Sequence, residues 1–149
     1  MRNWSGLKIY LVAIAWVGVT VLLPVFNSKM CFSMVLLFNC LQRFIFVFVL
    51  LLIFEIIDLQ VDSFSLATIP QKIGVKLTKK INYFLIIMFL LFDFLKQNNT
   101  HKSIWISFFV ASVLVLFTFF SSSKRNKYYT SFWVESVPVF WLVLVLLLA

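Results

Sequence analysis

The chain has 149 residues, of which 63% are hydrophobic and only 12% charged, and its mean hydropathy is +1.06. A soluble domain is roughly 45–50% apolar and about 25% charged, so a water-soluble fold of this length could not bury so much apolar surface. The net charge of +8 lies in short connections between apolar runs, which favours membrane topology over nucleic-acid binding. With one histidine and no CxxC pattern, the sequence also argues against a zinc site.

The apolar runs are continuous and do not alternate with period two, which predicts an all-α, polytopic membrane helix bundle. We expect one transmembrane domain over 1–149, with five spans. The expected spans are about 9–26, 31–57, 81–96, 104–121 and 132–149. A span needs about 20 residues, and the third run reaches this length only if the lysines at its ends extend to the interface.

Positive charge predicts the orientation of these spans. With five spans, nine Lys and Arg residues lie on the side of the N-terminus and three on the other side. Because positive residues gather on the cytoplasmic side, we expect a plasma (inner) membrane protein with a cytoplasmic N-terminus and an external C-terminus. The connection at about 55–80 is then cytoplasmic.

That connection holds three of the five acidic residues: Glu55, Asp58 and Asp62. If the second span continues through it, spacings of three and four place the three carboxylates on one helix face. Like charges on one face repel unless a cation lies between them, and carboxylate oxygens suit Mg²⁺. The alternative is a helix end that is solvated at the membrane interface.

The residues that follow are compatible with a phosphate-binding loop. Pro70 stiffens a turn and Gly74 allows it to relax. Four lysines could neutralise a diphosphate: Lys72, Lys76, Lys79 and Lys80. Juxtamembrane lysines on the cytoplasmic side are also routine, so either interpretation of them stays open.

The pattern Asp58-x-x-x-Asp62, Thr68-Ile-Pro70 and Gly74 resembles the second aspartate-rich motif of the UbiA-type intramembrane prenyltransferases. The last three spans would correspond to helices seven to nine of that family. The family also has a first motif, of the form N-D-x-x-D, which this sequence does not contain. The chain therefore resembles the C-terminal half of the fold.

The resemblance implies transfer of a prenyl group from an isoprenoid diphosphate, held through Mg²⁺, to a lipophilic acceptor such as a quinone precursor or a porphyrin. It implies metal binding by Asp58 and Asp62, with Glu55 as a neighbour, and diphosphate binding by Lys72 and Lys76. It makes Thr68, Pro70 and Gly74 a structural turn. No catalytic residue is assigned, and without the first motif we expect no activity from this chain alone. A complementary N-terminal half or a second copy would complete the site.

Three further ions lie in or near the apolar runs. Arg43 could pair with Asp93 or Glu135, or it could reach the interface by itself. A rival interpretation of the whole chain is a non-enzymatic small integral membrane protein, such as a transporter component or an assembly partner. In that case the acidic segment is a solvated interface and the turn is only a loop.

Overall fold

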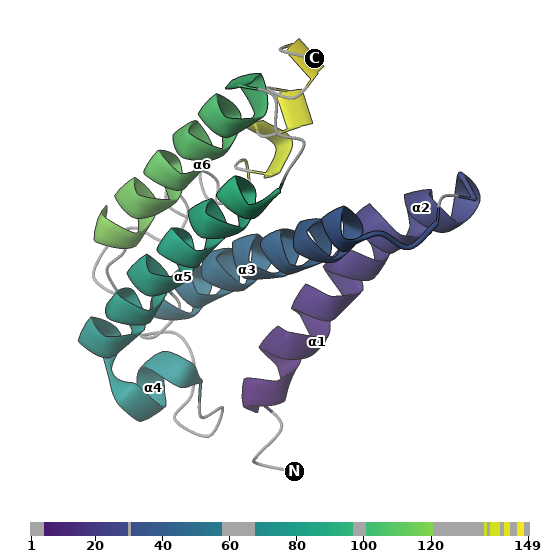
Figure 1. Ribbon diagram of the computed structural model, residues 1–149. Coiled ribbons are helices and arrows are strands. Elements are labelled where there is room, and N and C mark those ends of the chain that lie inside the picture. Colours follow the sequence, from purple (N-terminus) through teal and green to yellow (C-terminus); the bar gives the residue numbers. More distant parts are fainter. Residues whose placement is uncertain are drawn as a thin grey trace.

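The computed structural model describes residues 5–29, 31–57, 68–96 and 101–120, together with residues 136, 138–140, 142, 143, 146 and 147. Every secondary-structure element in this part of the chain is a helix (Figure 1). Three helical segments are long and apolar enough to cross a membrane: Leu7–Asn27, Met34–Ile57 and His101–Phe120. The fold is therefore that of an integral membrane helix protein, and these segments correspond to the first, second and fourth predicted spans.

The first membrane segment combines α1 (Ser5–Val17), the π-helix η2 (Gly18–Leu22) and α2 (Leu23–Asn27). Pro24 has no N–H to donate to the preceding turn, and the wider π-turn just before it accommodates the missing bond. The Thr20 hydroxyl donates to the Trp16 carbonyl at 2.7 Å within the same stretch. Pro24 thus produces a π-turn in a helix that continues to Asn27.

The second membrane segment is α3 (Met34–Ile57), which lies at the centre of the bundle and packs against α1, α5 and α6. Its first turn is capped by Ser33, whose Oγ accepts a hydrogen bond from the Leu36 N–H at 3.3 Å. Twenty-four helical residues extend about 36 Å at 1.5 Å per residue. This exceeds a hydrocarbon core of about 30 Å, so α3 can cross with a tilt.

After the second segment come the short α4 (Ile69–Ile73) and the long α5 (Val75–Leu95). The predicted third span begins at residue 81, whereas α5 begins at Val75, directly after Gly74. Lysine is a good helix former, and the lysines in this first part of α5 lie beside the fully buried Thr78. The basic residues assigned to a loop are therefore helical.

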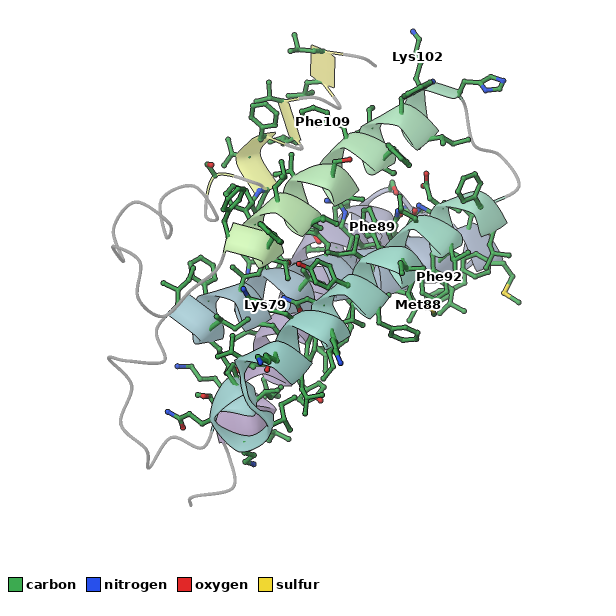
Figure 2. The ribbon with its side chains drawn as sticks, turned by 90° about the vertical axis from the view of Figure 1, so that its left-hand side faces the viewer. Lys79, Met88, Phe89, Phe92, Lys102 and Phe109 are labelled. Atoms are coloured by element: carbon green, nitrogen blue, oxygen red, sulfur yellow. The ribbon has the colours of Figure 1, made fainter. Side chains whose placement is uncertain are left out.

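The fourth predicted span is α6 (His101–Phe120), which packs along α5 (Figure 1). Small side chains on its buried face let the two helices approach closely: Ser107, Ala111 and Thr118. Lys79 and Lys102 lie at opposite ends of this helix pair (Figure 2). The last predicted span, 132–149, lies mostly outside the described residues.

The main core lies where α3, α5 and α6 meet. Its fully buried side chains come from all three helices: Val49, Ile53, Phe89 and Leu114. Large apolar side chains also cover the outside, and Phe84, Trp105 and Phe119 are each more than 60% exposed. In a bilayer this outer surface faces lipid, so packing and polar contacts, rather than removal from water, hold the helices together.

Candidate functional site

The Thr68–Gly74 segment forms a capped turn between α3 and α5. Thr68 precedes α4, and its N–H donates to the Gln71 Oε1 at 3.1 Å. Pro70 lies in the first turn of α4, where its fixed φ is compatible with a helix. Gly74 has a φ of 90°, a conformation that L side chains rarely adopt, and its N–H donates to the Pro70 carbonyl at 2.9 Å.

Glu55 joins this turn to the last part of α3. The Ile69 N–H donates to the Glu55 Oε2 at 3.2 Å, so the carboxylate binds a backbone donor at the first residue of α4. The two groups are 14 positions apart in the chain. One oxygen of a predicted metal ligand therefore has a structural role, as a link between α3 and α4.

The predicted diphosphate-binding lysines lie at the same end of the bundle as this turn. Lys72 is in α4 and Lys76 in the first turn of α5, and both are exposed. Lys80 is also exposed, on the same face of α5 as Lys76. Lys79 has a different role, because its Nζ donates to the Phe119 carbonyl of α6 at 3.3 Å.

The other two predicted metal ligands, Asp58 and Asp62, lie outside the described residues. Within the part of the chain that the structure describes, no three His, Cys, Asp or Glu residues gather as a metal-binding group. Glu55 is thus the one predicted ligand whose surroundings are defined. Its position at the end of α3, one helical turn before Asp58 in sequence, is compatible with a carboxylate cluster there.

A buried polar cluster that the sequence analysis does not predict joins α3 and α5 near the other end of α5. The Gln42 Nε2 donates to the Asp93 Oδ1 at 3.4 Å, and the Lys96 Nζ donates to the Gln42 Oε1. Lys96 and Asp93 also form an ion pair at 3.7 Å. Both side chains are nearly inaccessible, with 11% and 3% of their surface exposed. We call these three residues the Gln42–Asp93–Lys96 clamp.

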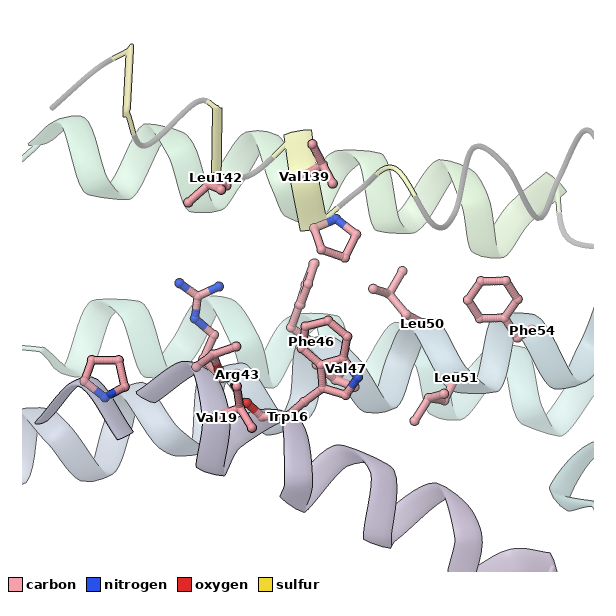
Figure 3. Close-up of a pocket in the computed structure, with 13 residues that line it drawn as sticks. Trp16, Val19, Arg43, Phe46, Val47, Leu50, Leu51, Phe54, Val139 and Leu142 are labelled. Carbon is pink, nitrogen blue, oxygen red and sulfur yellow. Dashed lines mark hydrogen bonds between the residues drawn. The ribbon is translucent and has the colours of Figure 1, made fainter. Parts of the chain in front are cut away.

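A cavity of about 620 Å³ lies between the first membrane segment, α3 and residues near 138–142 (Figure 3). Six of its lining residues belong to α3: Arg43, Phe46, Val47, Leu50, Leu51 and Phe54. The π-helix contributes Val19 and Thr20. Among the described lining residues Arg43 alone carries a charge, so the cavity is apolar with a guanidinium at one end.

These features define the class of protein: an integral membrane protein, helical in each element of the described residues, with a capped turn at one end of its central helix and a largely apolar cavity along that helix. In comparisons with known proteins, no family model, curated protein or solved structure matches the chain.

Proposed function

We propose that the chain is a UbiA-like prenyltransferase half, which binds an isoprenoid diphosphate through Mg²⁺ at the C-terminal end of α3. The observation that carries this proposal is the Glu55–Ile69 hydrogen bond at 3.2 Å. It joins the acidic end of α3 to the turn whose residues form the rest of the family-like pattern. The capped turn therefore lies beside the helix that would supply the metal-binding carboxylates.

The charges at this end suit the ligand. Carboxylates can share Mg²⁺ with diphosphate oxygens, because this ion binds through one or two carboxylates together with phosphates. The exposed ammonium groups of Lys72, Lys76 and Lys80 can offset the remaining negative charge of the diphosphate. The apolar helices offer the prenyl chain and a lipophilic acceptor a surface within the membrane.

The proposed role is that of a half-site. The chain contains no N-D-x-x-D sequence, so it would supply only one of the two aspartate-rich clusters that the family uses. These carboxylates would repel a bound diphosphate, because the second metal-binding cluster, whose Mg²⁺ would neutralise the diphosphate charge, is missing. Catalysis then needs a complementary N-terminal half or a second copy, and this chain alone binds without turning over.

Titration of farnesyl diphosphate into the detergent-solubilised chain, with and without Mg²⁺, tests this function. We expect weak binding that needs Mg²⁺ and that Asp58→Ala and Asp62→Ala each abolish. Glu135→Gln is the matched control, because it removes a carboxylate far along the chain, and it is expected to bind normally. Binding that is absent, or equal in the aspartate variants and the wild type, would contradict the proposal.

A second candidate is a non-enzymatic membrane protein, and the same hydrogen bond favours it. The Glu55 carboxylate already has a structural partner in the Ile69 N–H, which is a sufficient reason for an acidic residue at this place. In that case the lysines only anchor the cytoplasmic end. Absence of Mg²⁺-dependent binding in the titration would support this candidate.

A further inference from the structure

The cavity beside α3 reaches the end of the helix at which the diphosphate is proposed to bind. Phe54 lines the cavity directly before Glu55, and Leu51 lines it one helical turn before Glu55. Leu51 and Ile69, whose N–H donates to Glu55, also pack against the same apolar cluster. An apolar chain attached to a head group at this end of α3 therefore meets the cavity at Phe54.

The other end of the cavity is formed by Arg43, which lies near the middle of the membrane segment Met34–Ile57. Its side chain extends toward Leu142 (Figure 3). The guanidinium interacts with other groups of the protein, and its charge acts on Lys96 of the clamp. A charged group in an apolar setting keeps such contacts, because their loss would leave it desolvated and unpaired. Arg43 is therefore a polar end wall that an apolar chain does not displace.

The walls between these two ends are apolar. They include Phe46, Val47 and Leu50 of α3 and Trp16 of α1. The Thr20 hydroxyl, a polar group of the lining, already donates to the Trp16 carbonyl at 2.7 Å. The volume of about 620 Å³ lies within the usual range of about 300–1,000 Å³ for small-molecule pockets. The cavity therefore suits an uncharged, apolar chain.

The length of the cavity sets a limit on such a chain. Phe54 and Arg43 are 11 positions apart on α3, about 16 Å along the helix. Three extended main-chain bonds cover about 3.3–3.6 Å in a polypeptide, so the four main-chain bonds of an isoprene unit cover about 4.5 Å. Three isoprene units then need about 13–14 Å and four need about 18 Å. The third unit fits before Arg43, whereas the fourth meets the guanidinium.

We propose that this cavity holds the prenyl chain of the bound diphosphate and limits it to three isoprene units, with Arg43 as the residue that sets the limit. The proposal rests on the proposed function and names its substrate class, an isoprenoid diphosphate of farnesyl length. Detergent and lipid solvate an isoprenoid as well as the cavity does. The selectivity therefore comes from exclusion of the fourth unit and not from gain of apolar contact.

Titration of geranyl, farnesyl and geranylgeranyl diphosphate into the detergent-solubilised chain, with Mg²⁺, tests this limit. These ligands carry two, three and four isoprene units. An apolar group that does not fit its pocket costs a factor of about 10–200 in discrimination. We expect the wild type to bind farnesyl diphosphate at least about tenfold more tightly than geranylgeranyl diphosphate.

Val47→Phe moves the end of the cavity toward Phe54. Val47 and Phe54 are seven positions apart, about 10 Å along α3, which is room for two isoprene units. We expect this variant to bind farnesyl diphosphate about tenfold more weakly and geranyl diphosphate normally. Val35→Phe is the matched control, because Val35 is an exposed residue of α3 outside the lining. Comparing each variant with the wild type for the same ligand cancels the different uptake of the ligands by micelles.

Arg43→Ala removes the end wall and is expected to bring geranylgeranyl diphosphate to within a few-fold of farnesyl diphosphate. If this variant does not fold, Val47→Phe decides the matter alone. The proposal is overturned by a wild type without a length preference, or by equal losses of geranyl and farnesyl diphosphate in Val47→Phe. Mg²⁺-dependent binding in either case would leave the proposed function intact.

The parent alcohols, farnesol and geranylgeraniol, separate the two failures. Absence of Mg²⁺-dependent binding by all three diphosphates would contradict the proposed function and, with it, a diphosphate-borne chain in the cavity. A preference for farnesol over geranylgeraniol in that case would reassign the cavity to a neutral isoprenoid. The same preference beside Mg²⁺-dependent diphosphate binding is the result that we expect.

Discussion

Replacement of Asp93 by leucine is expected to destabilise the bundle strongly, because it leaves the Lys96 ammonium buried beside Arg43 without its carboxylate. At 3.7 Å and an effective dielectric constant of about 20, the Lys96–Asp93 attraction is about 4.5 kcal/mol. Removal of one partner from a buried pair costs about 3–5 kcal/mol, since the other charge remains desolvated. We expect Asp93→Leu and Lys96→Leu each to lower the free energy of unfolding by that amount.

The double variant Asp93→Leu/Lys96→Leu decides whether this reasoning holds. It removes both charges, so its remaining cost is the lost hydrogen bonding of Gln42, about 1–3 kcal/mol. Reversible unfolding in mixed detergent micelles measures all three variants, with Lys102→Leu as a control for loss of an exposed lysine. A double variant as unstable as the sum of the two single variants would refute a coupled, buried clamp.

Three further predictions concern topology, the turn and activity. In a protein without its two native cysteines, an impermeant maleimide is expected to label Lys76→Cys only from the cytoplasmic side and Lys102→Cys only from the outside. Labelling of both positions from the same side would contradict a single membrane crossing by α5. Gly74→Ala is expected to lower the free energy of unfolding by about 1–3 kcal/mol, because Gly74 has a φ of 90°. Gly18→Ala, with equally open space for a Cβ, is the control and is expected to be neutral or stabilising. Equal melting temperatures of the two variants would exclude backbone strain at Gly74. The purified chain is expected to transfer no prenyl group from farnesyl diphosphate with Mg²⁺ present, since it has one aspartate-rich motif; steady turnover would show that this motif suffices.

The three membrane segments could be predicted from the sequence because each is a largely continuous apolar run. The start of α5 could not, because a run of lysines after Gly74 is equally typical of a cytoplasmic loop. The buried Thr78 and Asn82 on the same helix give no hydrophobic signal either. What makes Val75–Lys80 helical is the turn before it, in which the Gly74 carbonyl accepts from the Thr78 N–H and hydroxyl.

The candidate sites differ in how far the sequence indicates them. The Thr68–Gly74 turn carries its own local signals, in a proline and a glycine at suitable positions. The clamp gives no local signal in the sequence, because Gln42 lies within an apolar run and its partners are 51 and 54 positions away. The cavity joins residues from three separate parts of the chain, so no local pattern could indicate it.

The central claim is that an isoprenoid diphosphate binds at the C-terminal end of α3, beside the turn that Glu55 holds. Photo-crosslinking with a farnesyl diphosphate analogue that carries its reactive group next to the diphosphate tests this most directly. Mapping of the labelled peptides by mass spectrometry is expected to place the label between Glu55 and Lys80, and only when Mg²⁺ is present. Label that appears without Mg²⁺, or that lies on the cavity residues near Arg43, would contradict the claim.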